Sequence, residues 1–259
     1  MAAANANGSA RHTVRVGVFI PTMCQLLDAA SVDIIGSMSY EYMTAFRHLL
    51  PEPVIDLAPF VEIHYIGSVR AGEHITLTSN ESILATDHYS DAAVAPGKLD
   101  IVLVPGPDPA SHPEAAALEW LSAQADTPGV DILSVCTGIF ICGEAGLLRG
   151  KRACGPRALQ DMIRQRGFGE KELIGDKYRW VQDGNLWSGG GVTNGNDLVA
   201  AYCRATPRHF ARPTVEMAIE TMEVGDRGRE YSDGQTEASL KKKIEDIIAE
   251  ANAIIAAKN

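Results

Sequence analysis

The segment "DILSVCTGIFICGEAGLL" (residues 131–148) runs from an apolar, strand-like stretch through a Cys-Thr-Gly corner into a helix-like stretch. A side chain at such a turn is raised above the sheet, and the helix start offers unpaired N–H groups and a positive dipole end. Both features favour a thiolate, so we expect Cys136 to titrate below the usual value of about 8.5. Gly138 leaves room for a ligand, and the N–H groups after the cysteine could hold a developing negative charge. The alternative is that Cys136 is a small buried core residue.

The sequence around this corner alternates between strand-like and helix-like segments. Such alternation predicts a parallel sheet with helices on both faces, in which ligands bind outside the carboxyl ends of the strands. We therefore expect the loops that follow residues 20, 104 and 135 to meet. The predicted strands are 14–20, 100–106 and 130–135, and the predicted helices are 26–50, 113–125 and 138–148.

Three further patterns complete the predicted fold. Residues 61–69 and 75–80 alternate with period two and indicate an exposed hairpin or edge. The stretch "YRWVQDGNLWSGG" (178–190) predicts an edge hairpin that turns at Asp183-Gly184. Helices are expected at 193–205 and 206–222, the second with Thr206 as its N-cap and Pro207 in its first turn.

The two ends of the chain differ from this pattern. Residues 1–12 are poor in apolar side chains and predict a flexible tail, so a single domain is expected over 13–224. Residues 225–259 predict a polar linker and an amphipathic helix. We expect this helix to dock on its own domain, with a helix across a dimer interface as the alternative. Its apolar stripe is Leu240, Ile244, Ile247, Ile248, Ala251, Ile254 and Ile255.

Composition excludes several classes of function. The net charge is −10, and no basic cluster interleaved with aromatic residues is present, which argues against nucleic acid as a partner. Apolar runs fall short of the roughly 18 residues of a membrane span, and no signal peptide precedes the fold, so we expect a soluble cytoplasmic protein. The five cysteines form no C-x-x-C pair, and no Cys/His spacing suits a metal, so we expect reduced thiols and no metal or other cofactor.

Three blocks in order resemble the DJ-1/ThiJ/PfpI family of the class I glutamine amidotransferase-like superfamily. They are "LVPGPDP" (103–109), "SVCTGIFICGEAGLLRGKRA" (134–153) and "WSGGGVTNGNDL" (187–198). The resemblance implies a flavodoxin-like three-layer sandwich, a strand-nucleophile-helix elbow at Cys136, and a homodimer. It does not choose a reaction.

The resemblance also implies a proton carrier. Members of its isocyanide hydratase branch have an aspartate in a "QLLD" context, and this chain has "CQLLDAA" at residues 24–30. Asp28 would then lie beside Cys136 with a raised pKa, since burial disfavours its charged form. Asp28 could also serve as the N-cap of the first helix. Thr137 would assist through its hydroxyl group.

Two departures from the family pattern bear on the site. Pro156 stands where many members have a histidine, so a Cys-His pair at that position is absent. The family's PGG loop is here Pro105-Gly106-Pro107-Asp108, and proline has no N–H group. That leaves Gly106 and Asp108 as expected donors of an oxyanion hole.

Two histidines are set aside. "HPE" at 112–114 matches a pair used by glutamine amidotransferases, but it precedes the cysteine instead of following it, and we interpret it as a helix start. His209, the only histidine after Cys136, is expected at the surface.

Three functions are compatible with these residues. The first is a hydratase acting on a small electrophilic substrate, with isocyanide hydration to an N-substituted formamide through a Cys136 thioimidate as its specific form. The second is a glyoxalase or deglycase acting on methylglyoxal. The third is a non-enzymatic redox-responsive or chaperone-like protein with an oxidisable cysteine. A transcription factor is not expected, because a single helix after the domain is too small for a helix-turn-helix module.

Overall fold

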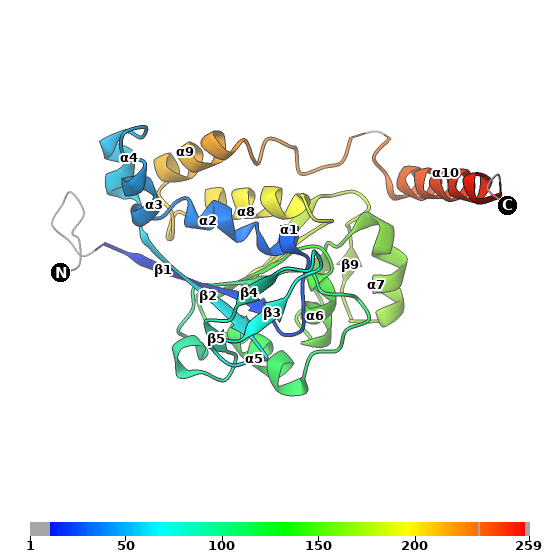
Figure 1. Cartoon of the computed structure of the whole chain (residues 1–259), viewed down its shortest axis with the longest axis horizontal. Helices are drawn as coiled ribbons and strands as arrows, with labels where there is room; N and C mark the ends of the chain where they lie inside the picture. Colours follow the sequence, from blue (N-terminus) through cyan, green and yellow to red (C-terminus); the bar gives the residue numbers. More distant parts are fainter. Residues whose placement is uncertain (1–10, 233, 257–259) are drawn as a thin grey trace.

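A seven-stranded sheet forms the centre of the computed structural model, which describes residues 11–232 and 234–256 (Figure 1). Its strand order is β10-β11-β7-β6-β1-β2-β5, and every neighbouring pair is parallel except β10 and β11. The strands are β1 (Thr13–Ile20), β2 (Phe60–Gly67), β5 (Asp87–His88), β6 (Ile101–Val104), β7 (Asp131–Ser134), β10 (Trp180–Asp183) and β11 (Leu186–Gly189).

Helices cover both faces of the sheet, as the alternating sequence predicted (Figure 1). One face carries α1 (Leu26–Ala29), α2 (Val32–Gly36), α3 (Tyr40–Ala45), α4 (Glu52–Leu57), α8 (Asn194–Ala205) and α9 (Arg212–Met222). The other carries α5 (Ala115–Asp126), α6 (Gly138–Glu144) and α7 (Gln160–Arg166). This arrangement is the flavodoxin-like α/β fold that the resemblance implied.

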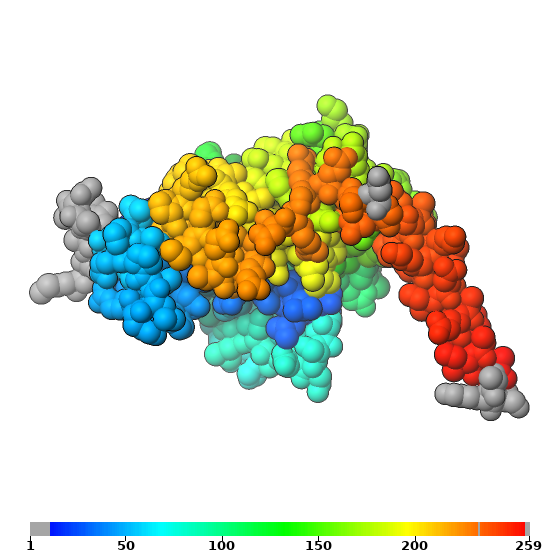
Figure 2. Space-filling view, turned by 90° about the horizontal axis from the view of Figure 1, so that it is seen from above, coloured from blue at the N-terminus to red at the C-terminus, as the bar shows by residue number. Residues whose placement is uncertain are grey.

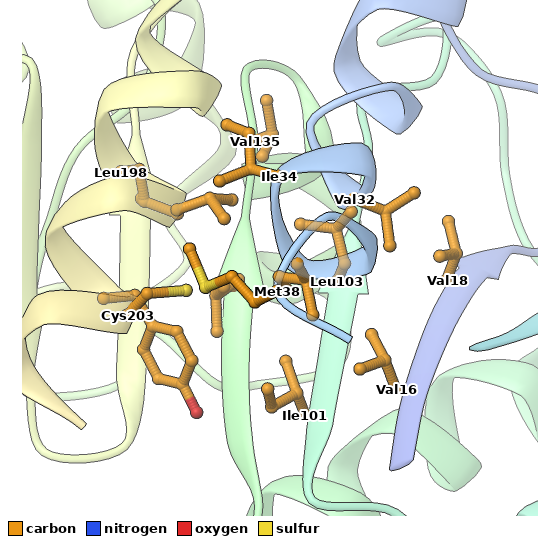
Figure 3. Close-up of a cluster of buried hydrophobic side chains, with 14 of the residues drawn as sticks. Val16, Val18, Val32, Ile34, Met38, Ile101, Leu103, Val135, Leu198 and Cys203 are labelled. Atoms are coloured by element: carbon orange, nitrogen blue, oxygen red, sulfur yellow. The ribbon is translucent and has the colours of Figure 1, made fainter. Parts of the chain in front are cut away.

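Two-residue periodicity assigns each strand side chain to one of two cores. Ile101 and Leu103 of β6 pack beneath α2 and α8, as Figure 3 shows, whereas Val102 and Val104 face α5 and α6. All four are fully buried, and each contributes roughly 1.5–3 kcal/mol relative to an exposed side chain. Burial on both faces explains why β6 is a continuous apolar run.

The single helix predicted for 26–50 is wrong: the segment forms three short helices, α1, α2 and α3. Serine side chains lie at the breaks. The Ser31 and Ser37 hydroxyls each donate 2.8 Å hydrogen bonds to carbonyls three residues earlier, and the Ser39 hydroxyl accepts one from the Tyr42 N–H at 3.1 Å. Serine competes with the helix for backbone groups, which apolar spacing alone does not reveal.

Of the two alternatives predicted for 61–69 and 75–80, the hairpin is wrong, whereas β2 does lie beside the edge of the sheet, next to the two-residue strand β5. β2 pairs in parallel with β1, while β3 (His74–Thr76) pairs with β4 (Ser82–Leu84) in a separate small sheet. Side chains of β2 are only half-buried, so its alternation resembled that of an edge hairpin. The hairpin of β10 and β11 is confirmed, with Gly184 at a φ of +63° in the turn.

Helix α9 begins at Arg212, later than predicted. Thr206 is not its N-cap, because its hydroxyl donates a 2.7 Å hydrogen bond to the Tyr202 carbonyl and ends α8. Pro213 takes the first-turn position that had been assigned to Pro207.

Both chain ends differ in part from expectation. Residues 1–10 of the predicted tail lie outside the described residues, but Arg11 is buried and its guanidinium donates to the carbonyls of Ile55, Asp56 and Ala58. At the other end, α10 (Glu237–Ala256) is the predicted amphipathic helix, reached through a linker that crosses the surface.

Candidate active site

Cys136 lies at the corner between β7 and α6, at the carboxyl edge of the sheet. Its φ is +56°, a left-handed conformation that is strained for any residue with a Cβ atom. The Cys136 N–H donates to the Gly190 carbonyl at 3.1 Å, which ties the corner to the loop after β11. Glycine is needed two residues later, at Gly138, because a Cβ there would collide with the Val104 carbonyl. The corner therefore has the geometry that the sequence predicted.

Asp28 approaches Cys136 from helix α1, in the segment after β1. Its side chain is fully buried, and its Oδ2 atom accepts a 3.0 Å hydrogen bond from the Gly106 N–H in the loop after β6. The Gln25 N–H donates to the Gly106 carbonyl at 2.9 Å, so the two loops are joined twice. The predicted meeting of the loops is confirmed. Asp28 does not cap the first helix, because it lies within α1, whose N-cap is Gln25.

The Asp28 carboxyl has an unusual pKa. Burial raises it from the ordinary 3.8 to about 7, although hydrogen bonds from the Gly106 N–H and the Cys136 thiol lower it. The second oxygen, Oδ1, is buried without a well-aligned hydrogen-bond partner. A carboxyl group that titrates near neutral pH and has one unsatisfied oxygen can both give and take a proton.

The Cys136 thiol does not titrate as predicted. Its pKa is raised to about 11, first by burial and then by the charge of Asp28. The side chain is only 7% exposed, and burial raises the pKa of Cys136 more than the N–H group of Thr137 at the start of α6 lowers it. Cys136 is therefore a thiol at rest. It needs a neighbouring base to become a nucleophile, and Asp28 is the neighbouring carboxylate.

Backbone N–H groups of Thr137 and Val192 interact with the Cys136 sulfur and lower its pKa. They favour the thiolate whenever the proton leaves. Sequence reasoning missed Val192. The signal was present in the loop after β11, because the "GGGVT" stretch (189–193) follows a parallel strand and must also reach the carboxyl edge of the sheet.

The predicted oxyanion donors are placed differently. The Gly106 N–H is already bonded to Asp28, and the Gly138 N–H donates to the Val135 carbonyl at 2.9 Å. Asp108 is exposed, and its carboxylate accepts from the Ala110 N–H at 2.9 Å within a turn. Gly106 and Gly138 therefore shape the site through their lack of side chains. The N–H groups that face the sulfur belong to Thr137 and Val192.

Thr137 holds the loop after β6 in place. Its hydroxyl donates a 2.7 Å hydrogen bond to the Pro107 carbonyl. A Cβ on Gly106 would overlap the Thr137 hydroxyl and the Asp28 carboxylate, so these three residues pack without spare room. The hydroxyl predicted to assist catalysis is thus committed to positioning the loop that supports Asp28.

The two histidines that were set aside lie elsewhere. His112 is largely exposed and lies 3.7 Å from the Glu144 carboxylate. His209 was expected at the surface, which is wrong: it is 7% exposed and its ring stacks on that of His12 at 6.2 Å. Since His12 directly precedes β1, this pair lies at the amino edge of the sheet, opposite Cys136. Among residues 11–232 and 234–256, no group of three potential ligands could hold a metal ion.

A family model described as the DJ-1/PfpI family matches residues 40–205, which include the elbow and the loops after β6 and β11. The chain belongs to the DJ-1/PfpI family. The isonitrile hydratase of Pseudomonas putida is 33% identical to this chain over 151 aligned residues. The aligned region spans 57% of this chain and 60% of that protein, so about two fifths of the hydratase has no counterpart in the match.

Solved structures of DJ-1/PfpI proteins share the fold. A ThiJ/PfpI family protein from Pseudomonas syringae superimposes with a TM-score of 0.63 at 21% identity, over 93% of this chain and 87% of that one. DJ-1beta of Drosophila melanogaster gives 0.60 at 14% identity, over 82% and 98%. No helix in the described part of the chain is long and apolar enough to cross a membrane.

Proposed function

We propose that this DJ-1/PfpI protein is a cysteine-dependent hydratase that converts an isocyanide to an N-substituted formamide. The observation that carries the proposal is the buried pair of Asp28 and Cys136, in which a carboxyl with a pKa of about 7 adjoins a thiol that is protonated at rest. The similarity to an isonitrile hydratase supports the same chemistry.

In the first step, Asp28 and Cys136 exchange a single proton. Asp28 as carboxylate takes the Cys136 proton, and the N–H groups of Thr137 and Val192 stabilise the thiolate. An isocyanide carbon can accept both a proton and a nucleophile. Asp28 returns the proton to that carbon while the sulfur attacks it, which gives the thioimidate R–N=CH–S–Cys136 and leaves Asp28 charged.

The second step consumes water. The Asp28 carboxylate removes a proton from water as the oxygen attacks the thioimidate carbon, and Asp28 then passes this proton to the nitrogen and is a carboxylate again. The resulting R–NH–CH(OH)–S–Cys136 collapses to R–NH–CHO, and the sulfur leaves with the remaining proton. The net reaction is the addition of one water molecule, with no oxidant or cofactor consumed.

The test is an assay of formamide production from several alkyl and aryl isocyanides. We expect turnover by the wild type, and loss of turnover in Cys136→Ala and Asp28→Asn. Cys142→Ala is the matched control, because Cys142 lies on the buried face of α6 and should be dispensable. A wild type that converts none of the isocyanides would refute the proposal. Lactate formation from methylglyoxal that depends on Cys136 would favour a glyoxalase instead.

Redox sensing is less well supported than hydration. Selective oxidation requires an accessible thiolate, and Cys136 is a buried thiol with a raised pKa. All five cysteines are free and buried, which supports a reducing compartment such as the cytoplasm. In this proposal residues 13–224 form the catalytic domain, and residues 225–259 are an appendage.

A further inference from the structure

Helix α10 extends away from the domain as an isolated arm (Figure 2). Only its start is held: the Lys241 ammonium lies 2.6 Å from the Asp161 carboxylate, and Arg157 donates to the Gln235 carbonyl just before the helix. Every residue from 241 to 256 is exposed. The prediction that this helix docks along its own domain is therefore wrong.

The exposed arm carries an apolar seam with coiled-coil spacing. Its seam residues recur at intervals of four, three, four and three along the helix, which matches the heptad repeat of paired helices. Ile247 and Ile255 are 64% and 60% exposed, which is costly in water. An isolated helix of this length is only marginally stable, so burial of this face would stabilise it. The seam residues are Ile244, Ile247, Ala251 and Ile254 on the exposed arm and Leu240, which is half-buried at its base, with Ile248 and Ile255 alongside.

The charged residues beside the seam indicate which molecule covers it. Lys243 and Glu250 each precede a seam residue by one position, so they line the same side of the seam with opposite charge. In an antiparallel pair of identical helices, residues on that side meet each other, and Lys243 lies beside Glu250 of the second copy in two symmetric contacts. A parallel pair would instead bring the three lysines at 241–243 together with their copies.

We propose that α10 pairs in an antiparallel two-helix coiled coil with α10 of a second copy of this chain. Ile244 packs against Ile247 of the second copy, and Leu240 packs against Ala251 of the second copy. The helix arm is then a device for self-association that is separate from the catalytic corner and does not depend on the reaction proposed for it.

Disulfide trapping in the full-length protein tests the pairing and its direction. Chains carrying Leu240→Cys are mixed with chains carrying Ala251→Cys under mild oxidation. An antiparallel pair yields the mixed disulfide, because the two positions face each other, while Ala251→Cys alone yields none. The five native cysteines are buried and provide a low background. The disulfide reports the helix pair even if the domains also associate by another surface.

Charge reversal supplies an independent test. Lys243→Glu and Glu250→Lys each place like charges opposite each other twice, and we expect each to weaken self-association about tenfold in sedimentation experiments. Mixing the two single variants, or combining both changes in one chain, restores opposite pairs and should restore association. Both side chains are exposed, so we expect folding of the domain to be unchanged, which circular dichroism checks.

Two results would overturn the proposal. A disulfide between two Ala251→Cys chains would show that the helices run parallel. Absence of the mixed disulfide, together with association that is unchanged by Ile247→Asp and by both charge reversals, would show that a second copy does not cover the seam.

Discussion

The Gly106 N–H donates a 3.0 Å hydrogen bond to the Asp28 carboxylate across 78 residues of sequence. This bond joins the loops after two adjacent strands and fixes the carboxyl group beside Cys136. It also lowers the pKa of a carboxyl that burial has raised to about 7, so the group remains within reach of physiological pH. The pKa of Asp28 depends on this balance between burial and the hydrogen bonds that the carboxyl accepts.

The pH dependence of reactivity should follow Asp28. Because the carboxylate must accept the thiol proton, kcat/KM for the isocyanide should rise with pH and level off above about pH 7. The same rise with pH, called the pH limb below, should appear in the rate of Cys136 alkylation by iodoacetamide. This measurement requires no substrate. Asp28→Asn should lack the limb in both measurements. A wild-type profile that is flat from pH 5 to 8 would show that Asp28 is not the base.

The stability of the fold should also depend on Asp28. The folded carboxyl keeps its proton up to about pH 7, whereas the unfolded one loses it near 3.8, so the folded state binds more protons between these values. Stability from this group is therefore highest near pH 4 and falls as pH rises through 7. Relative to wild type, Asp28→Asn should gain up to about 4 kcal/mol between pH 4 and 8, since each pKa unit is worth about 1.4 kcal/mol. Parallel urea-unfolding profiles for the two proteins would contradict this expectation.

Because the backbone at Cys136 is left-handed, we expect two inactive variants at this position to differ in stability. Glycine adopts a φ of +56° without strain, whereas alanine does not. Cys136→Gly should therefore be about 1 kcal/mol more stable than Cys136→Ala, while both lack activity. Thermal and urea unfolding of the two inactive variants provide the measurement. Equal stability would indicate that the corner relaxes when the cysteine is removed.

Gly106 should tolerate no side chain. A Cβ at this position would overlap the Thr137 hydroxyl and the Asp28 carboxylate, so Gly106→Ala must displace one of them. We expect at least a hundredfold loss in kcat/KM, since small misplacements of catalytic groups have effects of about that size. The matched control is Gly36→Ala in α2, whose Cβ would make only an ordinary 3.6 Å contact with Ile63. Equal activity of both variants would argue against tight packing around Asp28.

We expect the Thr137 hydroxyl to affect activity by holding the loop after β6 in place. Thr137→Val removes the donor to the buried Pro107 carbonyl and should cost about 1–3 kcal/mol of stability. Activity should fall with it, because the loop that supports Asp28 loses its anchor, and the pH limb should move away from 7. Thr137→Ser keeps the hydroxyl and should recover both properties. A Thr137→Val variant with an unchanged pH profile would indicate that the loop is held by other contacts.

The alternation of strands and helices and the position of the elbow followed from local pattern, but finer features did not. β6 and β7 are continuous apolar runs, and Gly138 directly after Thr137 allows the sharp turn into α6. The breaks between α1, α2 and α3 depend on serine hydroxyls that bond to the backbone, and apolar spacing does not record such bonds. The partner of β2 depends on which strand lies beside it, which a half-buried alternating pattern leaves open.

By itself, the sequence determined the α/β architecture and the corner at Cys136, because strand periodicity and turn residues are local properties of the chain. The approach of Asp28 to Cys136 was implied by the resemblance of its motif to that of the family. Only the tertiary structure decided the protonation of the site. Burial depends on side chains contributed by distant segments, and it made Cys136 a thiol where the helix dipole alone predicted a thiolate. The tertiary structure also decided that the Gly106 N–H bonds to Asp28 and that the Val192 N–H bonds to the Cys136 sulfur, since hydrogen-bond partners are fixed when the loops meet.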